Sequence, residues 1–303
     1  MEKIRLGILR GGDNEFYNSS LERGGSFMRY LHEKFADFVV GVDIFVDKEN
    51  IWHINGKAIE PTNLMHRVDV VWNFTHPSFS AFLNTLQIQN ITENIFANGF
   101  IDSRDILKNL IKENLLHNHV YIPRHLLLPS YQKDIDGDFE LFIHKKTKEV
   151  FNKFSSPWIV SIYPKSTDHS PVVVKTLEEL FLILEEYFSL NKSILVEEIA
   201  FGKEGVLYML GHFRNKNNYI FPLMDNFSTK EKEYIYDISN KIFELFKFTH
   251  FMKISFQLNN KNKIHIKEIS FNNFLLEEGG FDEALGLVSV KKEEILLSLL
   301  GIK

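Results

Sequence analysis

Short apolar segments alternate with amphipathic segments along the first third of the chain. Apolar runs at 4–9, 38–46, 68–73 and 90–95 predict strands, and the periodicity at 21–35 and 81–87 predicts helices. A polar stretch at 47–50 predicts a small hairpin leading to 51–54. Strands that alternate with helices form an open, mostly parallel sheet. We therefore expect 1–97 to fold as a Rossmann-like N-terminal α/β domain.

The rest of the chain is typical of two α+β subdomains, 98–197 and 198–303. In the first, helices are expected at 104–116, 139–154 and 177–188, with Ser103 and Thr176 as N-caps, and strands at 125–128, 158–163, 172–175 and 193–197. In the second, strands are expected at 205–213 and 219–223, and helices at 229–246 and 292–300. The three units have no repeat or low-complexity linker between them, which favours a ligand site between domains.

A predicted hairpin at 251–274 carries the clearest candidate chemistry. Apolar residues at 252, 254, 256 and 258 alternate with polar residues at 253, 255 and 257, so one face is apolar and the other polar. If 260–263 form a four-residue turn, Ser255 lies opposite Glu268 and Lys253 lies opposite Ser270. The polar face would then present one carboxylate, one lysine and two hydroxyls, as a sparse active-site floor.

Composition limits the class of protein. The chain has 303 residues, of which 44% are hydrophobic and 25% charged, as in a globular protein of two or three domains. A net charge of −5 gives no reason to expect a nucleic-acid partner. The apolar runs are too short to span a membrane and 1–3 lead directly into a strand, so we expect a cytoplasmic protein. The absence of cysteine excludes disulfides, thiolate zinc sites and cysteine nucleophiles.

Several motifs occur in an order that resembles the ATP-grasp family, and within it the D-alanine–D-alanine ligase branch. They are GILRGG at 7–12, VDVVWNFTH at 68–76, VVVKTLEEL at 172–180, SILVEEIAFGKE at 193–204 and IHIKEIS at 264–270. The resemblance implies an ATP-grasp fold that binds ATP and Mg²⁺ between two α+β subdomains. It also implies a reaction in which one D-alanine becomes an acyl phosphate that the amine of a second D-alanine attacks.

The resemblance assigns a nucleotide site. It places Glu197, Glu198 and Ile199 in the hinge against the base, and Glu204 at the ribose hydroxyls. Among the cations for the phosphates, Arg104 matches one family lysine.

The other family lysine matches Ser161, and Ser166 and Ser170 stand where loop glycines belong. Serine cannot supply the lost charge, and side chains restrict the backbone conformations that wrap a phosphate. Nearby Lys165 is a candidate replacement for the missing lysine.

The magnesium positions fall in the hairpin. The family's arginine, aspartate, glutamate and asparagine correspond here to Lys253, Ser255, Glu268 and Ser270, so Glu268 is the one strong metal ligand that remains. The following turn, which in the family supplies an amide to the oxyanion, is altered to Asn272-Asn273-Phe274.

The substrate side also departs from the family. The carboxylate that binds the first D-alanine matches Phe16, with Glu15 adjacent, whereas His76 is retained. The loop that closes over the family's site is reduced to 224–228, too short for a lid that excludes water.

These losses lead to three hypotheses. The first is a D-alanine–D-alanine ligase-like pseudoenzyme that has lost or nearly lost catalysis and serves as a binding or regulatory module. The second is a working ATP-dependent carboxylate–amine ligase for peptidoglycan precursor synthesis, with Glu15, His76 and Lys253 as catalytic candidates beside Arg104, Lys165 and Glu268. The third is nucleotide binding without chemistry. The expected partners are a nucleotide or an amino acid and, by resemblance, a second copy of the chain through its first domain.

Overall fold

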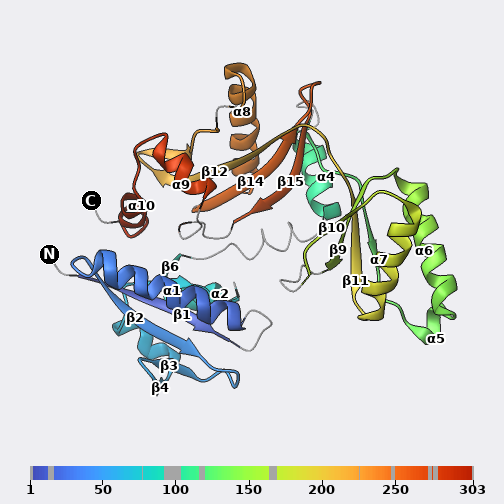
Figure 1. Cartoon of the computed structure of the whole chain (residues 1–303). Coiled ribbons are helices and arrows are strands. Elements are labelled where there is room, and N and C mark those ends of the chain that lie inside the picture. Colours follow the sequence, from blue (N-terminus) through green and yellow to red (C-terminus); the bar gives the residue numbers. More distant parts are fainter. Residues whose placement is uncertain are drawn as a thin grey trace.

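Three β-sheets organise the chain into three units (Figure 1). The computed structural model describes residues 3–12, 17–76, 78–91, 104–115, 120–163, 169–224, 226–246, 250–271, 275 and 279–301. The expected mixed α/β architecture is confirmed, with one sheet at the N-terminal end, one in the middle of the chain and one built mainly from the C-terminal third.

The N-terminal sheet has the strand order β4-β3-β2-β1-β5-β6. The neighbours β2-β1-β5-β6 pair in parallel, whereas β3 and β4 add an antiparallel hairpin at one edge, so the expected mostly parallel sheet is confirmed. Helix α1 packs on one face of the sheet, and η1 and α2 pack on the other. The bounds are β1 Ile4–Gly11, α1 Tyr17–Phe35, β2 Val39–Val46, β3 Trp52–Ile54, β4 Lys57–Ile59, η1 Pro61–His66, β5 Val70–Asn73, α2 Phe79–Thr85 and β6 Gln89–Ile91.

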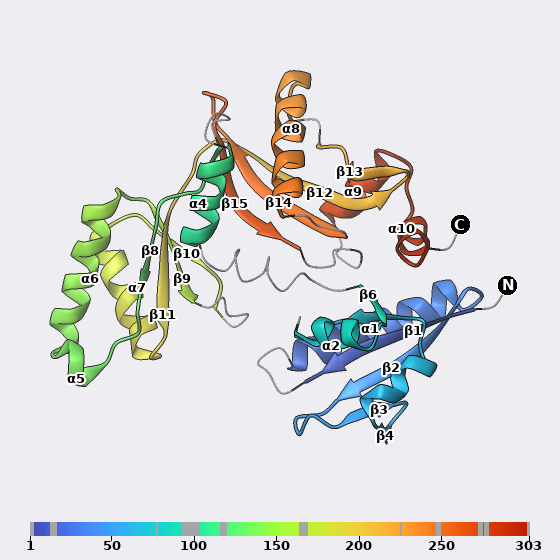
Figure 2. The ribbon, with the colours of Figure 1, turned by 180° about the vertical axis from the view of Figure 1, so that it is seen from behind.

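The central sheet has the antiparallel order β10-β9-β11-β8, and α6 and α7 cover the face that points away from the other units (Figures 1 and 2). Thr176 caps α7 as expected, in a capping box with Glu179. The opposite face of the sheet is turned toward the C-terminal unit. The bounds are β8 His125–Leu128, α5 Lys133–Asp136, α6 Phe139–Lys153, β9 Trp158–Tyr163, β10 Val172–Val174, α7 Leu177–Ser189 and β11 Ser193–Glu198.

The C-terminal sheet has the order β13-β12-β14-β15-β7, and α4 and α8 cover one of its faces. Helix α4 and strand β7 precede the central unit in the chain, yet Leu107, Ile111 and Val120 share a core with Ile254 and Phe256 of this sheet. Helix α9 has no counterpart in the sequence-based expectation. The bounds are α4 Arg104–Leu115, β7 Val120–Tyr121, β12 Lys203–Phe213, β13 Lys216–Ile220, α8 Thr229–Phe246, β14 Phe251–Leu258, β15 Ile264–Ser270, α9 Gly280–Gly286 and α10 Lys292–Leu299.

The second face of the C-terminal sheet changes character along its strands. At one end Tyr208, Leu210 and Phe251 share a core with α1, α9 and α10. The ring centroids of Trp72 in β5 and Phe251 in β14 lie 6.1 Å apart, so the N-terminal unit packs directly on this end. At the other end the same face is polar, and the candidate site lies there.

Candidate functional site

The candidate site is the polar end of the face formed by β12, β14 and β15. Pairing places Glu204 beside Gln257 and Val206 beside Ser255 on β12 and β14. On the opposite face Met252, Ile254, Phe256 and Leu258 are all buried, so the expected apolar side of the hairpin is confirmed.

The pairing of β14 with β15 also follows the expectation: Ser255 lies opposite Glu268, and Lys253 lies opposite Ser270. The connection differs from the expected one. Leu258 pairs with Ile264, which leaves a five-residue turn at 259–263, and the register shifts after Ser255. One extra residue in β15 therefore compensates for the longer turn.

This register shift is a β-bulge that allows two successive side chains to share the polar face. Ile266 and Ile269 are buried on the apolar side, whereas Lys267 and Glu268 between them are both half-buried. A regular strand of period two would turn Glu268 toward α4 and α8. The bulge therefore keeps Glu268 on the floor of the site.

The expected magnesium positions offer one carboxylate, that of Glu268, beside the hydroxyls of Ser255 and Ser270. The ammonium group of Lys253 lies 5.9 Å from the ring centroid of Tyr208. Within the described ranges, no three His, Asp or Glu side chains are grouped so that they can hold a metal ion. Magnesium is held in proteins by carboxylates that supplement phosphate and water oxygens. A lone carboxylate between two serines leaves most of the ligands to be supplied by phosphate and water oxygens.

Glu204, the expected ribose ligand, is engaged by neighbouring side chains. Its Oε1 atom accepts hydrogen bonds from Lys267 Nζ at 3.0 Å and from Gln257 Nε2 at 2.7 Å. These two bonds, the one from Lys267 being the stronger influence, hold the pKa of the Glu204 carboxyl below its usual value. The Glu204 side chain is 69% exposed, and its Oε2 atom has no hydrogen-bond partner in the described part of the chain. One oxygen is thus still directed to solvent.

Glu198, at the end of β11, forms a bidentate ion pair with Arg124, which precedes β8. The Arg124 Nε and Nη2 atoms donate to the carboxylate at 2.5 and 3.2 Å, and the Glu198 amide donates to the Arg124 carbonyl at 2.8 Å. Burial raises the pKa of the Glu198 carboxyl, but Arg124 outweighs burial and the pKa is lowered. The Glu198 carboxylate therefore fastens the end of β11. Its neighbours Glu197 and Ile199 are half-buried.

Ser161, which the sequence resemblance matches to the family's phosphate lysine, lies in the middle of β9 on the face away from α6 and α7. It is 5% exposed, and its hydroxyl donates to the carbonyl of Leu195 at 3.4 Å. The position that matches a cation is therefore a buried, neutral hydroxyl bonded to the next strand. Lys165 and Ser166 lie outside the described residues, and Ser170, just before β10, is exposed.

The remaining sequence candidates are only partly described. His76 lies three residues after the end of β5, and its Nδ1 atom is 2.8 Å from the hydroxyl of Ser78. Glu15 lies outside the described residues, and so do the Arg104 side chain and the turn at 272–274. Among the predicted site residues, the structure thus brings together Glu204, Lys253, Ser255, Glu268 and Ser270 on one sheet face, while Glu197 and Glu198 lie on the central sheet.

The segment 226–228, which the resemblance matches to the family's lid, is held against the sheet. Phe227 is 5% exposed and packs on Phe256 with 5.7 Å between ring centroids, and Asn226 donates to the Glu204 carbonyl at 3.2 Å. Ser228 and Glu231 form reciprocal hydrogen bonds at the start of α8. The described part of this segment has the packing of a fixed turn.

Three residues that contact the sequence candidates had not been assigned a role: Lys267, Gln257 and Arg124. A sequence signal exists for Lys267, because two adjacent polar residues interrupt the alternation of IHIKEIS and indicate a bulge. No comparable signal exists for Arg124, whose partner lies 74 residues away.

Comparison with solved structures identifies the architecture. The chain superimposes on D-alanyl-alanine synthetase A from Vibrio cholerae with a TM-score of 0.72 at 16% identity, covering 99% of this chain and 98% of that one. For the VanG D-Ala:D-Ser ligase from Enterococcus faecalis the TM-score is 0.72 at 11% identity, covering 99% of both chains. The fold is the ATP-grasp fold of the D-alanine–D-alanine ligases.

A third similar structure is the D-alanine–D-alanine ligase from Bacillus anthracis complexed with ATP, with a TM-score of 0.64 at 13% identity, covering 98% of this chain and 96% of that one. At these identities the likeness is one of fold. No family model matches the sequence.

One curated protein resembles this chain over most of the chain's length. The chain is 24% identical over 291 residues to "Probable polyketide synthase 9/36" from Dictyostelium discoideum, and the match covers 85% of this chain. It covers 9% of the synthase, so the chain spans less than a tenth of that protein. No helix among the described residues is long and apolar enough to cross a membrane.

Proposed function

We propose that this chain is a ligand-binding module with the D-alanine–D-alanine ligase fold, in which ATP-dependent ligation is lost or strongly reduced. The observation that carries the proposal is the pairing of Ser255 with Glu268 and of Lys253 with Ser270. Because Lys253, Ser255, Glu268 and Ser270 lie together on one face, the proposed loss of metal ligands rests on more than the alignment of a single residue.

The chemistry of phosphoryl transfer supports this reading. Such enzymes act mainly by positioning the phosphates and neutralising their charge with cations and metal ions. Here the matched floor carries one carboxylate, and Ser161 is a buried hydroxyl where the family has a lysine. The loss of a single electrostatic stabiliser commonly lowers a rate by about a hundredfold or more. Several losses together leave little catalysis.

The proposed ligand is a nucleotide bound through its adenosine part. Glu204 keeps one oxygen directed to solvent, and the exposed side chain of Val206 lies two residues along β12 on the same face. Exposed Phe201 precedes the strand. An apolar surface beside a carboxylate suits a base and its ribose hydroxyls.

Two measurements test the proposal. Purified protein with MgATP and D-alanine should yield no ADP, phosphate or dipeptide above a protein-free control. In calorimetry, ATP should bind with the same affinity with and without magnesium, because the donor set does not hold the metal. Turnover that disappears in Glu268→Gln would overturn the proposal, and so would an affinity for ATP that rises with magnesium.

A working ligase with a rearranged site is the second candidate. The retained Glu268 and the cation that Lys253 keeps in place of the family's arginine favour it. The similarity to a protein named as a polyketide synthase suggests acids other than D-alanine. The turnover assay therefore includes an apolar carboxylic acid with D-alanine as the amine. ATP-dependent amide formation from that pair would establish this alternative.

A further inference from the structure

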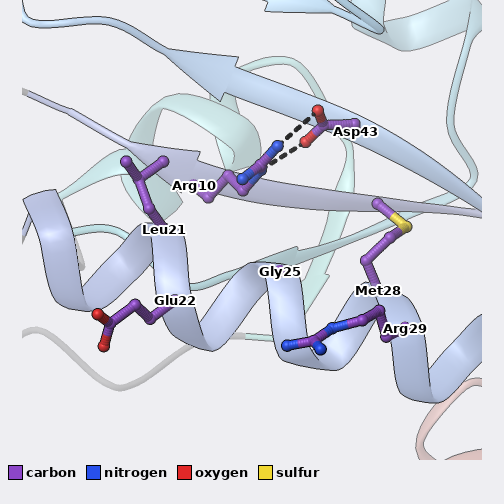
Figure 3. Close-up of a pocket in the computed structure, with 7 residues that line it drawn as sticks. All are labelled: Arg10, Leu21, Glu22, Gly25, Met28, Arg29 and Asp43. Atoms are coloured by element: carbon purple, nitrogen blue, oxygen red, sulfur yellow. Dashed lines mark hydrogen bonds and ion pairs between the residues drawn. The ribbon is translucent and has the colours of Figure 1, made fainter.

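A groove between α1 and β2 of the N-terminal unit is not used by the proposed nucleotide site. It has a volume of about 410 Å³ and is lined by Arg10 of β1, Asp43 of β2 and one side of α1 (Figure 3). This volume lies within the range of small-molecule sites. β5, which leads to His76, borders β1 on the side opposite to β2, so β1 separates the groove from that residue.

Glycines explain why the groove exists. Gly24 of α1 lies so close to β1 that an added Cβ would stand 3.1 Å from the Cβ of Arg10. One position further along, an added Cβ on Gly25 would meet no atom within 4 Å. The helix is thus seated on β1, and space opens between Gly25 and β2. The core beneath α1 includes Val39 of β2, but Asp43 further along that strand remains half-buried.

An ion pair forms the wall of the groove on the sheet side. The Arg10 Nε and Nη2 atoms donate to the two carboxylate oxygens of Asp43 at 2.6 and 2.8 Å. The two side chains are 28% and 29% exposed, so solvent screens the pair only partly. The third nitrogen, Nη1, has no partner in the described part of the chain, and it carries two further donors.

Charges of both signs also stand on the helix side. Glu22 and Arg29 are exposed on α1, seven residues and therefore about two turns apart. Within the described ranges, Glu22 has no ion pair or hydrogen bond, and Arg29 donates only a long hydrogen bond of 3.4 Å to Ser26. Two arginines and two carboxylates give the groove a formal charge of zero.

The apolar part of the lining comes from Leu21 and Met28, which stand on either side of Gly25 and face the ion pair (Figure 3). Both are half-buried side chains on the groove side of α1. A ligand that fills the groove therefore meets apolar side chains together with charged groups of both signs.

We propose that this groove binds a small zwitterion, a free α-amino acid with an apolar side chain. Its carboxylate accepts from Nη1 of Arg10, its ammonium group pairs with Glu22, and its side chain contacts Leu21 and Met28. A simple anion such as phosphate fits less well, because Asp43 and Glu22 would repel it. A simple cation would likewise be repelled by Arg10 and Arg29. The balanced charges of the groove therefore favour a ligand that carries both a positive and a negative group.

The test is calorimetry of the full chain without nucleotide or magnesium, so its outcome is independent of ligase activity. The probes are L-leucine and D-leucine, with isoamylamine and isocaproate as analogues that lack the carboxylate or the amine. A ligand of this size is expected to bind with a dissociation constant on the order of 1 mM. Each analogue should bind about tenfold or more weakly than leucine, because it loses one charge-assisted contact.

Two variants and a site-specific signal place the ligand. Gly25→Leu should fill the groove and abolish binding, and Glu22→Gln should weaken binding about tenfold. Glu33→Gln, an exposed carboxylate of α1 outside the groove, is the matched control and should bind leucine normally. In the wild type, the methyl resonance of Met28 should shift as leucine is added. If Gly25→Leu does not fold, the location of the ligand is tested by the weaker binding of leucine to Glu22→Gln and by the shift of the Met28 resonance.

Three results would overturn the inference. One is the absence of saturable binding of either leucine enantiomer up to about 30 mM, well above the expected dissociation constant. Another is binding of isocaproate as tightly as leucine, which would indicate an anion site. The third is leucine binding that a folded Gly25→Leu variant retains.

Discussion

The ammonium nitrogen of Lys267 in β15 lies 3.0 Å from the carboxylate of Glu204 in β12, although β14 separates the two strands. Lys267 lies on the polar face by the alternation of β15 from Ile264 and Ile266, and the bulge next to it keeps Glu268 on the same face. The bulge therefore sets two successive side chains, Lys267 and Glu268, side by side on the proposed site face.

Replacement of Lys267 by methionine should raise the pKa of Glu204, because the largest cause of its lowered value is removed. The free energy of unfolding should change by less than about 1 kcal/mol, since the two side chains are 41% and 69% exposed. Carboxyl-carbon NMR as a function of pH measures the pKa. Lys261→Met, in the exposed turn of the same hairpin, is the control. An unchanged Glu204 pKa in Lys267→Met would contradict the role assigned to this ion pair.

The local patterns in the sequence predicted much of the fold. Alternation of apolar and polar residues indicated the two faces of the hairpin, and the pairing of Ser255 with Glu268 is as expected. The expected turn was one residue too short, and the unexpected bulge compensates for it. The longer turn and the bulge shift the pairing of β14 with β15 by one residue each in opposite directions, so Ser255 still lies opposite Glu268.

Long-range packing could not be predicted in the same way. The periodicity of α4 indicates a helix with an apolar side, but not that Leu107 and Ile111 pack under the C-terminal sheet. Likewise, the glycine pair in α1 gives no sign of which one touches β1. Such contacts depend on the arrangement of distant segments, which no local pattern contains.

Trp72 and Phe251 should couple the stabilities of the N-terminal and C-terminal units. Trp72 is 1% exposed and lies 4.4 Å from Phe27 and 6.1 Å from Phe251 between ring centroids. Trp72→Ala should lower the free energy of unfolding by about 3–5 kcal/mol. In urea titrations, the double variant with Phe251→Ala should differ from additivity by about 0.5–1.5 kcal/mol. As a control, Trp158→Ala in the central core should be additive with Trp72→Ala. Coupling of equal size between Trp158 and Trp72 would mean that the coupling with Phe251 does not report a direct contact.

His250 should make the stability depend on pH. Burial, followed by the neighbouring His212, lowers the pKa of His250 from 6.5 to about 4. The unfolded state therefore binds more protons between these values, and stability should fall as the pH falls from 6.5 toward 4. The expected loss is on the order of 2–3 kcal/mol. His250→Gln should flatten the slope in denaturant titrations at several pH values, whereas exposed His32→Gln should not. If the stability of His250→Gln depended on pH as steeply as that of the wild type, His250 would not be the cause of the pH dependence.

The two adjacent glycines of α1 should respond in opposite directions to alanine. Gly25→Ala should stabilise the protein by about 0.5–1 kcal/mol, because alanine favours the helix and its Cβ enters open space. In Gly24→Ala the new Cβ would stand 3.1 Å from the Cβ of Arg10, which the strand holds in place, so stability should fall. Thermal unfolding of the two variants measures the difference. Equal effects would show that α1 is not seated on β1 as described.

Restoration of the missing ligands is the most direct examination of the floor of the site. Ser255→Asp combined with Ser270→Asn would add two oxygen ligands beside Glu268, since Ser255 lies opposite Glu268 and Ser270 lies two residues beyond it on the same strand face. In this double variant, magnesium should raise the affinity for ATP about tenfold or more, as measured by calorimetry, whereas in the wild type it should have no effect. Addition of Glu268→Gln should abolish the gain, because the strongest ligand is then removed. A double variant that binds ATP equally well with and without magnesium would mean that this face is not the metal position of the fold.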